Sequence, residues 1–255
     1  MSIYRFLILI SLIGIMFQSC RPEKGDLLPT GILEMNFKVV YDGEPVVFKN
    51  GQYTYEDGQP ISFEQFNFYI SNVALVAPTT NDESDIFDIK LVEFSDTTIA
   101  AANAGKTFSR TGIPVGNYSG IRFDLGVPDD ANTSKGFPEG KYFGTHPLNH
   151  EDQYSETFKS YIFMRLEGLY GTNNELFRFR PATKALFAED LDFPKSITIQ
   201  ETSKTNLNFV IDLKDILTEN NQAIDLATDY ETNIDNMETL GSKLMYNLRA
   251  SFSMQ

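Results

Sequence analysis

The sequence predicts a mainly β protein, an antiparallel β-sandwich of the immunoglobulin-like class with one or two short helices near the C-terminus. Segments in which apolar and polar residues alternate recur along the chain, and turn residues separate them. Helical spacing of apolar residues is found only late in the chain. Of the 255 residues, 42% are hydrophobic, with 21 Phe and 12 Tyr, which is enough apolar surface for a substantial core.

The first predicted strands follow from alternation and from residue types that favour strands. Residues 33–39 (LEMNFKV) alternate strictly, which predicts a half-buried strand, and Asp42-Gly43 then marks a turn. Residues 66–76 and 85–94 are rich in aromatic and β-branched side chains. A polar turn separates them, so we predict two further strands there.

The central and later strands follow the same logic. Residues 118–127 alternate again. Residues 161–169 and 176–179 are predicted to pair as a hairpin, because the short polar stretch between them contains Gly171. In residues 207–211, every second side chain is apolar and faces one way.

Helices are predicted only near the C-terminus. Residues 213–217 can form one short helix, and apolar residues at helical spacing predict another over 235–247, although Gly241 weakens it. Residues 249–254 are predicted as a last strand. No shift in composition divides residues 31–255, which we therefore treat as one domain.

The N-terminus resembles a bacterial lipoprotein signal. Arg5 precedes an apolar run over residues 6–17, which is too short to cross a bilayer as a helix and suits a secretion signal. The run ends at Cys20, the single cysteine of the chain, with small Ser19 before it. This pattern predicts cleavage before Cys20 and lipid attachment to its sulfur. The alternative is ordinary secretion with an incidental cysteine.

These features divide the chain into a lipoprotein signal peptide (1–19), a lipid-attached tether (20–30) and the domain (31–255). The expected location is the bacterial cell envelope, anchored to the outer membrane and facing the periplasm or the surface. The formal net charge of −14 repels phosphate backbones, so we do not expect a nucleic-acid partner.

Catalytic motifs are missing from the sequence. It contains no GxSxG elbow, no Walker loop and no HExxH, and its histidines number two. A carboxylate pair could serve a glycosidase, but 35 acidic residues supply such pairs by chance. We therefore predict that the protein is not an enzyme.

The two histidines form the candidate metal site. His146 and His150 are four residues apart, a spacing that places two ligands on one helix face. Glu151, Asp152 or Glu167 could complete the ligand set. The alternative is that both histidines are exposed loop residues, because two ligands alone rarely make a tight site.

Four blocks of sequence together resemble a known family. They are FNFYISNVALV (66–76), GNYSGIRFDLGVPDDAN (116–132), HPLN (146–149) and YIFMRLEG (161–168). Their order and spacing are similar to those of the MbnP-like family of secreted and lipidated bacterial proteins. The resemblance implies a β-rich sandwich, copper binding through histidines and an oxidised Trp, and a haem-containing oxidase as partner.

The chain departs from the family pattern where the metal ligands are expected. The family's Trp-containing stretch is replaced by residues 153–161, and the chain has no Trp. The two expected histidines would fall at Val39 and Arg180, and a guanidinium is a permanent cation that cannot bind copper. We hypothesise that Arg180 pairs with a nearby acid, so that a salt bridge replaces the metal.

The sequence therefore predicts a lipid-anchored binding protein of the cell envelope. In one reading it binds copper or another metal through a rebuilt site that contains His146, His150, Glu151 and Asp152. In the other reading it is a metal-free structural or interaction module on the same fold.

Overall fold

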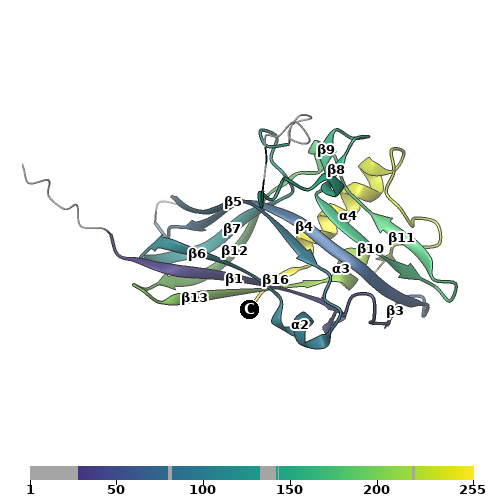
Figure 1. Cartoon of the computed structure of the whole chain (residues 1–255), viewed down its shortest axis with the longest axis horizontal. Coiled ribbons are helices and arrows are strands. Elements are labelled where there is room, and N and C mark those ends of the chain that lie inside the picture. Colours follow the sequence, from purple (N-terminus) through teal and green to yellow (C-terminus); the bar gives the residue numbers. More distant parts are fainter. Residues whose placement is uncertain (1–27, 80–81, 133–141, 143, 220–221) are drawn as a thin grey trace, which may run out of the picture.

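The computed structural model describes residues 28–79, 82–132, 142, 144–219 and 222–255 (Figure 1). The predicted signal peptide, Cys20 and most of the tether lie outside the described residues. Leu28 and Pro29 are exposed, and the first strand begins at Thr30. Within the described ranges, no helix is long and apolar enough to span a membrane.

The smaller of the two main sheets contains one parallel pair. Its order is β16 (Phe252–Met254), β13 (Lys204–Asp212), β1 (Thr30–Tyr41) and β2 (Glu44–Pro45), and β6 (Lys106–Pro114) also pairs with β1. β1 and β13 run parallel, from Ile32 opposite Lys204 to Val40 opposite Asp212. The prediction of a purely antiparallel sandwich is wrong at this pair. Parallel strands need a crossover connection, and here most of the chain lies between the two partners.

The larger sheet is antiparallel throughout. Its order is β11 (Glu175–Phe179), β10 (Met164–Tyr170), β4 (Pro60–Val76), β7 (Gly116–Leu125) and β12 (Ala188–Ile199), and β3 (Tyr53–Thr54) and β5 (Glu83–Phe94) also pair with β4. β4 is the central strand. Its pairing with β10 ends at Phe68 and its pairing with β7 begins at Ile70, so β4 changes neighbours at Tyr69.

The predicted strands are largely confirmed. The alternating segment 33–39 lies within β1, in which every second residue is buried. The predicted hairpin is β10 paired with β11, from Leu166 opposite Phe179 to Tyr170 opposite Glu175. The sequence did not predict β6 and β12, which are mostly exposed strands.

The helices are short and differ in part from the prediction. α3 (Leu213–Leu217) has the predicted bounds. In place of one helix over 235–247, a π-helical turn, η3 (Met237–Gly241), leads into α4 (Ser242–Ala250). Because α4 extends to Ala250, the last strand begins at Phe252 and not at Arg249. The remaining short elements are α2 (Ile99–Ala104), η1 (Glu151–Gln153), β8 (Tyr154–Ser155), β9 (Ser160–Tyr161), η2 (Lys184–Leu186), β14 (Thr218–Glu219) and β15 (Gln222–Ala223).

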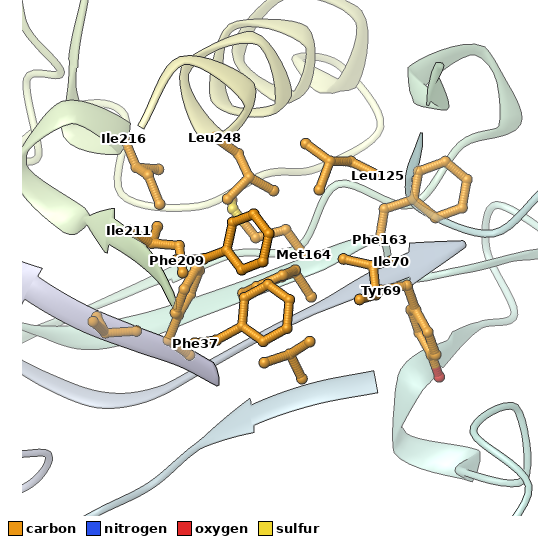
Figure 2. Close-up of a cluster of buried hydrophobic side chains, with 14 of the residues drawn as sticks. Phe37, Tyr69, Ile70, Leu125, Phe163, Met164, Phe209, Ile211, Ile216 and Leu248 are labelled. Atoms are coloured by element: carbon orange, nitrogen blue, oxygen red, sulfur yellow. The ribbon is translucent and has the colours of Figure 1, made fainter. Parts of the chain in front are cut away.

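The core lies between the two main sheets and is rich in aromatic rings. Phe37 of β1 and Phe209 of β13 are register partners, and their rings stack with centroids 5.0 Å apart. Figure 2 shows both rings among buried residues from both sheets, together with Ile216 of α3 and Leu248 of α4. The protein is thus mainly β, with several antiparallel sheets and a short C-terminal helix. An immunoglobulin-like arrangement stays a prediction.

Candidate functional site

Both histidines lie on a long connection that leaves and rejoins the larger sheet beside Tyr69. The Tyr69 carbonyl accepts a hydrogen bond from the Gly126 N–H (2.9 Å), and the Tyr69 N–H donates to the Phe163 carbonyl (3.0 Å). These bonds fall where β4 changes neighbours. Figure 2 shows the Tyr69 ring pointing away from Phe37 and Phe209. The described part of the connection therefore packs on the face of the larger sheet opposite to Phe37 and Phe209.

Two buried tyrosines hold this connection through its backbone. The Tyr69 hydroxyl donates to the Pro147 carbonyl (3.0 Å), and the Tyr161 hydroxyl donates to the Leu148 carbonyl (2.8 Å). The two rings meet edge to face, with centroids 5.9 Å apart. Burial raises the pKa of both hydroxyls, so they stay protonated donors at neutral pH. The segment that follows His146 is therefore fixed by two hydrogen bonds in a buried environment.

Asn132 joins the beginning of the connection to its end. Its side chain is fully buried, its amide Nδ2 donates to Ser160 Oγ (2.9 Å), and its Oδ1 accepts from the Tyr161 N–H (3.0 Å). An amide that bonds at both ends in a dry environment fixes the relative position of two segments. Asn132 is thus a structural residue of the connection.

The two histidines are half-buried and have separate roles. His146 stacks on Tyr142 with ring centroids 4.4 Å apart, and its Nδ1 accepts a hydrogen bond from the Leu148 N–H (3.1 Å). His150 precedes the 3₁₀ helix η1, and its carbonyl accepts from the Gln153 N–H (3.1 Å). The chain forms turns and irregular backbone between residues 146 and 150, so no helix aligns the two imidazoles on one face.

Beside this loop lies a network of two arginines and two carboxylates. Arg180 Nε donates to Glu167 Oε1 (2.6 Å), and the Arg180 Nη2 also contacts that oxygen. Arg165 Nε lies 3.8 Å from the same Glu167 oxygen. Arg165 then reaches the loop, since its Nη2 donates to the Asp152 carbonyl and its Nη1 lies 3.6 Å from Asp152 Oδ2. The prediction that Arg180 pairs with a nearby acid is confirmed.

The network is electrostatically strained at Arg165. Its side chain is only 9% exposed, and the pKa of its guanidinium is lowered, first by burial and then by repulsion from Arg180. Three of the buried side-chain atoms that lack a hydrogen-bond partner in the described residues lie here: Arg165 Nε, Asn67 Oδ1 and Gln153 Oε1. Asn67 is the register partner of Arg165 on β4. Unsatisfied buried polar groups are uncommon in folded proteins, so a cluster of them is an unusual feature of this region.

The residues present do not fit a copper centre of the family's type. Val39 is buried in the core, and Arg180 is engaged with Glu167. Glu151 and Asp152 are exposed, and Asp152 faces Arg165. In the part of the chain that the structure describes, no three His, Cys, Asp or Glu side chains lie together as a ligand set.

The sequence did not single out the residues that organise this region. Tyr69 and Tyr161 lie within predicted strands, and no pattern in the sequence marks Arg165. Arg165 occupies a polar position in an alternating strand, which normally marks a solvent face. It is buried because the 146–153 loop covers that face. The resemblance, by contrast, did point to Arg180.

The fold and this region together define a mainly β protein in which a long loop packs on the outer face of the larger sheet. The MbnP family model matches residues 30–239, so the chain belongs to the MbnP family. Among solved structures, MbnP from Methylosinus trichosporium is similar, with a TM-score of 0.48 and 12% identity over 73% of this chain and 77% of that one. A search of curated proteins gave no match.

Proposed function

We propose that this chain is a lipid-anchored, non-enzymatic binding protein of the cell envelope, and that an arginine–carboxylate network has replaced metal chemistry in it. The observation that carries this proposal is the ion pair between Arg180 and Glu167. Arg180 stands where the family resemblance implies a copper-binding histidine. A guanidinium has no lone pair to give a metal, and its positive charge disfavours a cation nearby.

The local chemistry supports the same conclusion for the other candidate ligands. His146 Nδ1 already accepts a hydrogen bond from the Leu148 N–H, so that nitrogen must break this bond before it can bind a metal. Glu167 is the acidic partner of both Arg165 and Arg180. A metal that took Glu167 would leave Arg165 buried beside Arg180, with the exposed Asp152 as its remaining acidic neighbour.

The competing reading is a rebuilt metal site made of His146, His150, Glu151 and Asp152. Family membership favours it, because the family resemblance implies copper binding. It requires the loop to change conformation so that both imidazoles and a carboxylate converge. If Asp152 supplies that carboxylate, the change must also break its contact with Arg165.

The anchor and the location belong to the same proposal. Lipid attachment at Cys20 would hold the protein on the outer membrane, and the tether of residues 20–30 would separate the membrane from the domain. The membrane is then one partner, and a haem-containing oxidase is a second that the family resemblance implies. We expect no nucleic-acid partner, because the net negative charge of the chain repels phosphate backbones. An immunoglobulin-like sandwich is the expected finer description of the fold.

Metal content tests the proposal directly. The soluble form that starts at Arg21 is loaded with Cu(I), Cu(II) or Zn(II), dialysed, and analysed for bound metal by mass spectrometry. We expect no stoichiometric metal in this protein or in its His146→Ala and His150→Ala variants. Stoichiometric copper that is lost in both variants would establish the rebuilt site and reject the metal-free function.

A further inference from the structure

The outer edge of β11 is only partly used by the fold. β11 is the terminal strand of the larger sheet, with β10 on its inner side (Figure 1). On its outer side, the Arg178 N–H donates to the Tyr230 carbonyl (2.7 Å), and the Arg178 carbonyl accepts from the Thr232 N–H (3.1 Å). Residues 230–232 thus already add to this edge as a short parallel segment.

Strand geometry shows that Leu176 presents the same kind of edge. In an antiparallel pair, residues alternate between bonding to the partner strand and turning their backbone groups outward. Arg178 turns outward, so Leu176, two residues earlier, does so as well. No backbone group of the described residues outside the sheet bonds to the Leu176 N–H or carbonyl. Leu176 therefore offers one donor and one acceptor to an incoming strand.

The chain that could cover Leu176 turns away before reaching it. The Asp225 carbonyl accepts from the Thr228 N–H (3.1 Å) and from the Asp229 N–H (2.7 Å), which closes a turn just before Tyr230. This turn leaves a groove of about 300 Å³ beside the strand edge, lined by Glu175, Leu176, Leu226, Ala227 and Tyr230. Leu176 is 41% exposed and Tyr230 is 49% exposed. The groove is therefore apolar, open and next to unused backbone groups.

The charge around the groove is mainly acidic, although Arg178 is an exposed basic residue on the same strand. Residues 215–242 contain seven Asp and Glu residues and no Lys or Arg. The groove itself is lined by Glu175 and by no basic side chain. A basic ligand is favoured at such a surface. A second copy of this chain is disfavoured, because its net charge is −14.

We propose that the β11 edge binds an extended, basic segment of another protein by strand addition. The segment pairs with the backbone of Leu176 and places one apolar side chain in the groove. Its Lys or Arg residues lie beside the turn that contains Asp225 and Asp229. Main-chain hydrogen bonds supply part of the affinity in this mode, and the side-chain pocket supplies specificity. The inference does not depend on whether the protein binds metal.

A tryptophan-containing peptide tests the proposal, because the chain has no Trp and emission excited at wavelengths that Tyr does not absorb reports the peptide alone. The probe is the blocked peptide Lys-Val-Lys-Trp-Lys-Val-Lys, titrated with the full lipidated chain in detergent. We expect a saturable blue shift of its emission. Leu176→Lys should weaken binding by about tenfold or more, since it removes the apolar wall and adds a like charge.

The matched control is Ile99→Lys on α2, where an exposed apolar residue (54% exposed) receives the same charge. It should leave binding unchanged. A peptide with N-methylated backbone nitrogens and a peptide with Glu in place of Lys should both fail to bind. Circular dichroism of both variants confirms that they fold.

Several results would overturn the inference. Equal loss in both variants would mean non-specific charge attraction, and no loss in Leu176→Lys would place the peptide elsewhere. Full binding of the N-methylated peptide would reject strand addition. Concentration-dependent dimerisation that Leu176→Lys abolishes would make a second copy the occupant.

Discussion

Replacement of Glu167 by Gln removes the negative charge that two arginines share. The Glu167 side chain is 14% exposed and that of Arg165 is 9% exposed, so neither is well solvated. Glu167 Oε1 accepts from Arg180 Nε at 2.6 Å and lies 3.8 Å from Arg165 Nε. The substitution leaves a buried guanidinium facing a second cation, with Asp152 as its remaining acidic neighbour.

The size of the effect follows from burial. Removing one partner from a buried ion pair costs about 3–5 kcal/mol in unfolding free energy. We expect about 3 kcal/mol for Glu167→Gln, because Asp152 still contacts Arg165. The comparison variant is Arg180→Gln. The Arg180 side chain is 38% exposed and repels Arg165, so its loss should cost about 1 kcal/mol or less.

Urea unfolding at pH 7 measures the unfolding free energy of both variants, and thermal unfolding in the same buffer measures their Tm; both are followed by circular dichroism. For a chain of this size, each kcal/mol corresponds to a shift in Tm of about 2–4 °C. Glu167→Gln should therefore melt about 6–12 °C lower, and Arg180→Gln about 4 °C lower at most. Equal losses in the two variants, or a cost of less than about 1 kcal/mol for Glu167→Gln, would refute the view that Glu167 neutralises a buried Arg165.

Four further outcomes are expected. Gly168→Ala should lower the unfolding free energy by about 3 kcal/mol in urea titrations, because the added Cβ would clash with the Ser62 carbonyl and lie 2.6 Å from the Phe177 ring; an unchanged midpoint would show that the two strands separate easily there. Tyr161→Phe should cost about 1–3 kcal/mol by leaving the buried Leu148 carbonyl without its donor, and hydrogen exchange should show a looser 146–153 loop with little change in β1. The hydrogen bond to Asp57, followed by burial, raises the pKa of Tyr170 to about 12. Because the folded state holds this proton more tightly than the unfolded state, the stability that Tyr170 contributes is complete below about pH 10 and is lost between about pH 10 and 12. Tyr170→Phe should therefore flatten the fall in urea midpoint across that range. Intact mass spectrometry of the full chain should find lipid on Cys20 and none on Cys20→Ser, whereas an unmodified Cys20 would favour ordinary secretion.

Local pattern was sufficient for the elements that bury one face. β1 alternates because every second side chain enters the core, and this period is readable in LEMNFKV. The β10–β11 hairpin was predicted because its two strands are close in sequence and joined by a turn containing Gly171. β6 and β12 lie at sheet edges and are mostly exposed, so their residues carry little hydrophobic period.

The family resemblance allowed one part of the candidate site to be predicted, namely the position of Arg180. The resemblance singled out Arg180 and led to the expectation of an acidic partner, which the structure identifies as Glu167. The candidate ligands Glu151 and Asp152 are next to His150 in the sequence, yet both are exposed and Asp152 faces Arg165. Closeness along a chain does not bring side chains together when the chain between them is non-helical.

The sequence by itself determined the strands that bury one face, the short helix at 213–217 and the membership in the MbnP family, since these depend on residue type and period. The tertiary structure decided that β1 and β13 pair in parallel, that the loop around His146 covers the outer face of the larger sheet, and that Arg165 is buried there. Each of these depends on contacts between segments that are distant in sequence. Such contacts are set by how whole sheets pack, and no local pattern in the chain encodes them.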